Sequence, residues 1–176
     1  MSRRYPDEPA GPFPSPPHGF IDGEGREIRV RAVEGDPETV EALVETYDDF
    51  DPAERAQGLP PSKEPAIRDW LDTLFEGGGH NVVAWHGDDA VGHATLVPDG
   101  DGGYELAIFV HQDYQGAGIG TELITHLLGH GADEGVERVW LTVERWNHPA
   151  VRLYEKVGFE TTDSAGFSTE MSLRLH

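Results

Sequence analysis

The chain has 176 residues, no cysteine, and 33 acidic residues against 13 basic ones, which gives a formal net charge of −20. This length suits one domain with a tail, and the lack of cysteine excludes disulfide bonds, a thiolate nucleophile and cysteine-ligated zinc. Nucleic-acid binding needs clustered lysine and arginine, so the charge balance argues against it.

The acidic residues are spread over every segment of the chain. This distribution favours adaptation to concentrated salt, in which counter-ions screen the self-repulsion of a halophilic protein. A second interpretation stays open, in which the negative field attracts a cationic acceptor. The sequence has neither a membrane-spanning apolar run nor a signal-peptide core, so it predicts a cytoplasmic protein without membrane contact.

Residues 1–26 contain six of the 13 prolines and few aliphatic residues. Such a segment cannot form a packed helix or strand, so we expect an N-terminal arm that is extended or partly disordered. The folded domain is expected at residues 27–176. It begins with a strand, because Ile28, Val30 and Ala32 alternate with charged residues.

Two helices are predicted next. Asp36 can cap the first helix, with Pro37 in its first turn, and the helical pattern ends near Phe50. Prolines predict a loop over residues 51–61. Ser62 is the predicted cap of the second helix, which carries an amphipathic apolar stripe.

The rest of the chain alternates between period-2 and helical patterns. It predicts strands at 82–86, 90–97, 104–111 and 138–144, helices at 119–135 and 149–157, and two terminal strands. The whole order is β-α-α-β-β-β-α-β-α-β-β, which is typical of a mixed sheet with helices packed on it.

A glycine-rich stretch separates the strand at 104–111 from the following helix. It reads Gln115-Gly116-Ala117-Gly118-Ile119-Gly120. Glycines let the main chain approach a ligand, and the first N–H groups of a helix bind anions, so the main chain of residues 115–121 is a candidate phosphate cradle. A turn that merely permits tight packing is the alternative. The lack of a nearby lysine excludes a P-loop, and the glycine spacing argues against a dinucleotide fingerprint.

This stretch resembles the Q-x-x-G-x-G motif of the GCN5-related N-acetyltransferase (GNAT) superfamily. The segments YELAIFVHQDYQGAGIGTELI, VERVWLTVERWN and HPAVRLYEKVGF follow the middle of that family in order and spacing. The resemblance implies an α/β fold with a mostly antiparallel sheet of about seven strands and helices on both faces. It also implies acetyl-CoA as the co-substrate, with its pyrophosphate at the glycine turn.

Two residues are candidates for catalysis. Glu105 is the candidate base, because alternation places it on the same apolar strand face as Ala107 and Phe109, where the pKa of a carboxyl group rises. A solvated Glu105 near the strand's start is the alternative. Tyr154 matches the family's general acid, with packing on its helix face as the alternative.

The resemblance also implies which residues contact CoA. These are Phe109, Val110, Gln115, Gly116, Ala117, Gly118, Ile119, Gly120, Thr121 and Asn147. For Phe109 and Val110 the contact runs through the main chain and the pantetheine arm. Asn147 is explained equally well as the N-cap of the next helix, which has Pro149 in its first turn.

No metal is expected. His126 and His130 lie four residues apart on one helix, but neither an acid nor a cysteine completes a site, so we expect solvated surface histidines. Three tryptophans are expected in the core or in pocket walls: Trp85, Trp140 and Trp146.

The function predicted from these patterns is acetyl transfer to a primary amine of a small molecule or peptide. The acceptor is expected to enter opposite CoA, between the loop at residues 51–61 and residues 162–167. The alternative function is a non-catalytic sensor of acyl-CoA. A homodimer is an open expectation.

Overall fold

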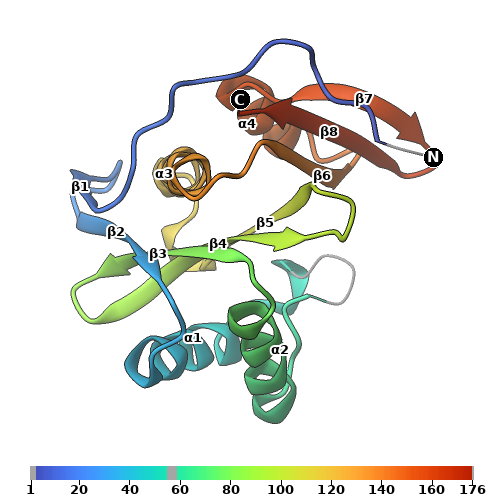
Figure 1. Ribbon diagram of the computed structural model, residues 1–176. Helices are drawn as coiled ribbons and strands as arrows, with labels where there is room; N and C mark the ends of the chain where they lie inside the picture. Colours follow the sequence, from blue (N-terminus) through green and yellow to red (C-terminus); the bar gives the residue numbers. More distant parts are fainter. Residues whose placement is uncertain (1–2, 55–58, 176) are drawn as a thin grey trace.

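The computed structural model describes residues 3–54 and 59–175 (Figure 1). The strands are β1 His18–Ile21, β2 Glu27–Val33, β3 His80–His86, β4 Asp89–Pro98, β5 Tyr104–Val110, β6 Arg138–Glu144, β7 Glu160–Ala165 and β8 Ser168–Arg174. The helices are α1 Pro37–Asp48, α2 Glu64–Glu76, α3 Ile119–Asp133 and α4 His148–Val157, with 3-10 turns η1 Pro52–Glu54 and η2 Gln112–Tyr114. The predicted element order is therefore confirmed from β2 onward.

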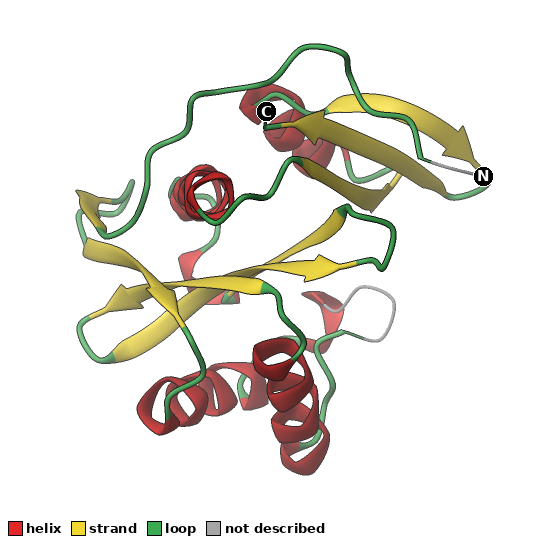
Figure 2. Cartoon of the chain, in the orientation of Figure 1, coloured by secondary structure: helices red, strands yellow, loops and turns green. Residues whose placement is uncertain are grey.

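One sheet organises the molecule (Figure 2). The described strands form an 8-stranded sheet in the order β1-β2-β3-β4-β5-β6-β8-β7. All neighbouring strands are antiparallel except β5 and β6. This confirms a mixed, mostly antiparallel sheet, with one strand more than expected. Among the described residues, no helix combines the length and the apolar character needed to cross a bilayer.

Two apolar layers cover opposite faces of this sheet (Figure 1). On one face, α3 and α4 bury Leu123, Leu127 and Tyr154 against β2 to β6 and β8. On the other, α1 and α2 bury Leu43 and Leu71 against β3 and β4. The apolar cluster of α1 and α2 reaches across the sheet as far as Phe109 of β5. It contains no residue of β6, β8 or β7.

The N-cap predicted from local sequence is correct for α1 and wrong for α2. Asp36 caps α1 as predicted, because its carboxylate accepts from the Thr39 amide at 3.2 Å. The prediction for α2 is wrong: the N-cap is Lys63, and it makes no side-chain capping bond. With Ser62 as N-cap, the third helical position would be Pro65, which has no N–H to donate.

The N-terminal arm lies along the domain. The Ala10 amide donates to the Arg174 carbonyl at 2.7 Å. The prediction that the arm forms no strand is wrong, because β1 belongs to the arm and pairs with β2 in the sheet. The arm also passes closely over α3, where a Cβ on Gly129 would overlap the Pro14 carbonyl. The arm therefore runs from the β7–β8 end of the sheet, across α3, to the opposite edge (Figure 1).

Candidate active site

The only parallel pair of strands in the described sheet separates after two residue pairs. Strands β5 and β6 pair at Tyr104 with Val139 and at Glu105 with Trp140. Beyond Glu105 they part, and a cavity of about 550 Å³ lies between residues 106–110 of β5 and residues 142–144 of β6. This volume is in the range of small-molecule sites. The cavity is therefore a gap in the sheet itself.

The cavity brings together nearly all of the residues that the sequence singled out. Its walls include Glu105, Phe109, Val110, Gln115, Gly116, Gly118, Ile119, Gly120, Thr121, Asn147 and Tyr154. Ala117 does not line it: its side chain is buried, and its carbonyl accepts from the Gly23 amide at 2.9 Å. Ala117 faces the domain because the left-handed glycines on both sides of it reverse the chain direction locally.

The glycine turn leaves the helix start open. Gly116 and Gly118 have φ of 73° and 89°, and the space where each would carry a Cβ is empty to 4 Å. Gly118 is the N-cap of α3, and no side chain caps this helix. The first N–H groups of α3 are therefore available to an anion, which the helix dipole also favours. Gly120 shows neither a left-handed φ nor crowding, so the backbone does not require glycine there.

Gln115 holds the mouth of the cavity together. Its side-chain amide donates to the Val110 carbonyl at 3.0 Å and to a Glu54 carboxylate oxygen at 3.1 Å. These bonds tie the turn to the end of β5 and to η1. The Val110 carbonyl is therefore already hydrogen-bonded to Gln115. In this structure the Gln115 side chain stabilises the turn.

Glu105 lies at the point where the two strands part. Its side chain is partly buried, and burial raises its pKa above the usual 4.5. The positive charge of Arg3 opposes this shift, and the negative charge of Asp99 adds to it. The carboxyl group therefore holds a proton more tightly than a free glutamate, which suits a general base near neutral pH.

Tyr154 of α4 forms part of the opposite wall. Only 9% of it is exposed, its ring packs against Phe159, and burial raises its pKa to about 12. Its phenol therefore stays protonated at neutral pH and can donate to a group in the cavity. Packing and cavity lining coexist here, because the ring contacts the core while the residue borders the open space.

Asn147 has the capping geometry that the sequence offered as one interpretation. Its side-chain oxygen accepts from the Ala150 amide at 3.3 Å, and it is the N-cap of α4. Asn147 also borders the cavity. Its role in starting α4 is thus structural, and its location leaves it within reach of a bound ligand.

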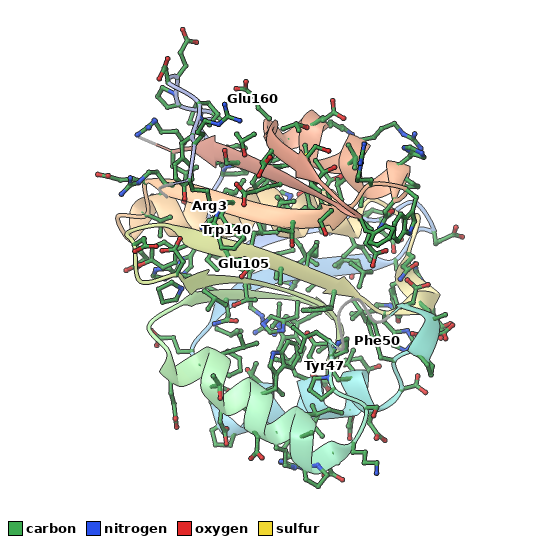
Figure 3. All side chains as sticks on the ribbon, turned by 90° about the vertical axis from the view of Figure 1, so that its right-hand side faces the viewer. Arg3, Tyr47, Phe50, Glu105, Trp140 and Glu160 are labelled. Atoms are coloured by element: carbon green, nitrogen blue, oxygen red, sulfur yellow. The ribbon has the colours of Figure 1, made fainter. Side chains whose placement is uncertain are left out.

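The cavity wall facing α1 was only partly foreseen. Phe50 and Leu59 line it, and Phe50 lies beside Tyr47 (Figure 3). The Phe109 ring packs edge-on to Tyr47, with centroids 5.8 Å apart. The 51–61 loop thus contributes as expected, although its Arg55 and Gln57 lie outside the described residues. Residues 162–167 are not among the described residues that line the cavity, although the Phe167 carbonyl accepts from the Arg145 amide beside the lining residue Glu144. Strand β7 is separated from β6 by β8.

Other sequence interpretations also change. His126 is 2% exposed, so it is not a surface residue as predicted. Its ring stacks on His18 of the arm, with centroids 4.6 Å apart, and both histidines lie beside Glu122. The arm covers this helix face, which local spacing could not reveal. Trp85 and Trp140 are buried as expected, but Trp146 is exposed and contacts Phe167.

Known proteins share features with this chain. The sequence profile described as Acetyltransferase (GNAT) family matches residues 40–159. Mycothiol acetyltransferase of Nocardiopsis dassonvillei is 31% identical over 171 residues, covering 90% of this chain and 51% of the relative. An uncharacterized N-acetyltransferase of Mycobacterium bovis is 34% identical over 87 residues, covering 49% of this chain and 56% of the relative. The chain spans about half the length of the curated relatives it matches.

Solved structures share the fold. The GNAT domain of S. lividans PAT has a TM-score of 0.78 at 16% identity, covering 90% of this chain and 97% of that one. The putative acetyltransferase yncA of Salmonella typhimurium, solved with acetyl-CoA, has a TM-score of 0.66 at 19% identity, with coverages of 84% and 94%. The PaiA N-acetyltransferase of Thermoplasma acidophilum, in complex with coenzyme A, has a TM-score of 0.62 at 18% identity, with coverages of 82% and 98%.

Proposed function

Because the chain belongs to the acetyltransferase (GNAT) family, we propose that it transfers an acetyl group from acetyl-CoA to a primary amine within a ternary complex. One observation carries the proposal. A single cavity joins the uncapped start of α3 to the carboxyl group of Glu105 and to Tyr154. An anion cradle, a base and an acid are the three parts that this reaction needs.

Acetyl-CoA would bind with its diphosphate at the main chain of residues 115–121. The open space in front of Gly116 and Gly118 supports this, because a phosphate needs close approach to the amides. The pantetheine arm would enter the gap between β5 and β6, alongside Phe109. Beyond Glu105, β5 has no paired strand on that side, so main-chain groups before Val110 could bond the arm. The Val110 carbonyl already accepts from Gln115.

The reaction then needs two proton transfers. Glu105 accepts a proton from the amine, directly or through water, and the nitrogen attacks the thioester carbonyl carbon. The new C–N bond replaces the C–S bond, and Tyr154 protonates the departing thiolate. The phenol recovers its proton from solvent, so the products are the amide and free CoA thiol. The raised pKa of Tyr154 keeps it in the acid form required here.

The test is an amine panel in concentrated KCl, with acetyl-CoA as donor, free thiol as the readout and mass spectrometry of the products. Thiol release that depends on an amine, with a matching acetylated product, supports the proposal. A reaction without amine controls for hydrolysis.

Calorimetry with CoA separates the remaining outcomes. CoA binding without transfer to any amine would replace the enzyme by an acyl-CoA sensor. A folded protein that does not bind CoA at all would overturn both functions.

A further inference from the structure

Arg3 of the N-terminal arm occupies an aromatic and acidic recess. Its guanidinium carbon lies 3.3 Å from the centroid of the Trp140 ring. Its Nε donates to a Glu170 carboxylate oxygen at 3.1 Å, and its Nη1 lies 3.8 Å from an Asp99 carboxylate oxygen. An aromatic face with two carboxylates is the environment that selects organic cations. We call Trp140, Asp99 and Glu170 the cation recess.

The cation recess is organised by contacts that do not involve Arg3. The Trp140 Nε1 donates to Asp99 at 2.9 Å, and the amides of Asp101 and Gly103 donate to the same carboxylate at 2.7 and 3.1 Å. The Asp99 side chain is 9% exposed. Burial alone would raise its pKa, but these hydrogen bonds together with the positive charge of Arg3 lower it. The hydrogen bonds from Trp140, Asp101 and Gly103 hold the carboxylate in position independently of Arg3.

The cation recess adjoins the reaction site. Trp140 is the strand partner of Glu105 at the last pair before β5 and β6 part. Figure 3 shows Arg3, Trp140 and Glu105 next to one another across these strands. A molecule with one cationic group in the recess would therefore extend past Glu105 toward the cavity. Helices α1 and α2 do not cover β6 and β8 on this face. The arm lies there instead, with Arg3 over Trp140 and Tyr5 against Arg138.

Arg3 can leave without releasing the arm. The Ser172 hydroxyl donates to the Arg4 carbonyl at 3.0 Å, and the Arg174 Nε donates to the Pro6 carbonyl at 2.8 Å. The Ala10 amide bonds β8 as well. The Arg3 side chain itself is 29% exposed. A tethered side chain competes at an effective concentration on the order of millimolar, so a free cation of modest affinity can displace it.

We propose that the acceptor carries a second cationic group, which binds in the cation recess in place of Arg3. This inference rests on the proposed function. The acceptor class is then a diamine or a peptide with a basic side chain near the amine that is acetylated. Arg3 competes with the acceptor for this subsite, so the arm lowers the affinity for the acceptor.

The first test is calorimetric titration with diaminobutane, and with butanol as the uncharged control, at the lowest KCl concentration that keeps the protein folded. Arg3→Ala should bind diaminobutane about tenfold more tightly than the wild type, because the competitor is gone. Arg4→Ala is the matched control, since it removes the same charge from the arm without emptying the recess. Equal affinities in the wild type and in both variants would overturn the proposal.

A second pair of variants tests the recess itself. In the Arg3→Ala background, Glu170→Gln should lower the affinity for diaminobutane about tenfold, as expected for loss of one charge-assisted contact. Glu160→Gln removes a surface charge on the neighbouring strand β7 and should leave the affinity unchanged (Figure 3). An equal loss in both variants would mean that net charge alone attracts the diamine, and would overturn the recess.

Kinetics connects the recess to the reaction. The wild type should prefer diaminobutane to butylamine in kcat/KM, and Arg3→Ala should widen this preference. Transfer with equal kcat/KM for both amines overturns the recess as an acceptor subsite and leaves the proposed function intact. The expected binding pattern without transfer to any amine overturns the proposed function and leaves the recess as a cation site.

Discussion

The two sides of the candidate site are built in different ways. The proposed CoA side consists of the main chain of one short stretch, residues 115–121, in which glycines hold the helix start open. The proposed acceptor side consists of side chains from separate segments: Glu170, Asp99 and Trp140 meet in the cation recess, where Arg3 contacts Glu170 across 167 positions of the chain. One side follows from local backbone geometry, and the other depends on the completed fold.

This difference predicts how each side responds to change. A main-chain cradle has no side chain to lose, so only a change in backbone conformation or an added Cβ can damage it. A side-chain site can be altered one group at a time, and each carboxylate contributes its own charge. Variation in acceptor is therefore possible without loss of the CoA site.

The largest expected effect is at Glu105, where the two sides meet. Glu105→Gln should lower kcat/KM by about 10³-fold at neutral pH, within the range for general acid–base catalysis. In the wild type, activity should fall as the pH drops through the raised Glu105 pKa, above 4.5, because the protonated acid cannot accept a proton. A pH–rate profile measures this limb.

Arg3 and the cation recess sharpen this prediction. The Arg3 charge lowers the Glu105 pKa, so Arg3→Ala should move the acidic limb of kcat/KM to higher pH. The limb of kcat should move less if a bound acceptor supplies the second cation.

Glu105→Gln should not reduce the melting temperature, because burial penalises the ionised carboxylate. An unchanged acidic limb in Glu105→Gln would remove this residue from the mechanism.

Tyr154→Phe should lower turnover by about 10²-fold while CoA affinity stays nearly unchanged. The phenylalanine keeps the packing against Phe159 and removes only the hydroxyl. Because the Tyr154 pKa is raised to about 12, its ionisation should cause no loss of activity up to moderately alkaline pH. Steady-state kinetics and calorimetry give the two readouts, and equal turnover in both proteins would exclude the phenol as the acid.

Gly118→Ala tests the CoA side and should weaken CoA binding about tenfold, because a Cβ would enter the space that a phosphate needs. Gly135→Ala is the matched control: Gly135 has φ 91° against 89° for Gly118, and its Cβ space is also empty. Both variants should lose about 1–2 kcal/mol of stability to left-handed strain. Equal CoA affinity in the two variants would contradict the cradle.

The smallest expected effect comes from salt. Raising KCl from millimolar to molar concentration should increase the melting temperature, since screening relieves the repulsion of a chain with net charge −20. The same screening should weaken the Arg3 ion pairs, so salt should act in opposite directions on the fold and on the recess. A melting temperature independent of KCl would argue against adaptation to salt.

The comparison of sequence with structure follows the same division. Strand alternation and the Asp36 cap depend on neighbours within a few residues, and the structure has them where the patterns indicated. Lys63 is the N-cap in place of Ser62, for which Pro65 would remove one of the two N–H groups that a capping side chain can use. His126 was misread because the arm that covers it is distant in sequence.

The sequence by itself determined the order of elements from β2 onward, the glycine turn before α3 and the family, because all of these depend on spacing along the chain. Only the tertiary structure decided that Arg3 lies on Trp140 beside Glu105, and that the arm covers His126. The reason is physical: local backbone preferences act over a few residues, whereas the surroundings of a side chain are set by whichever distant segments the fold packs against it.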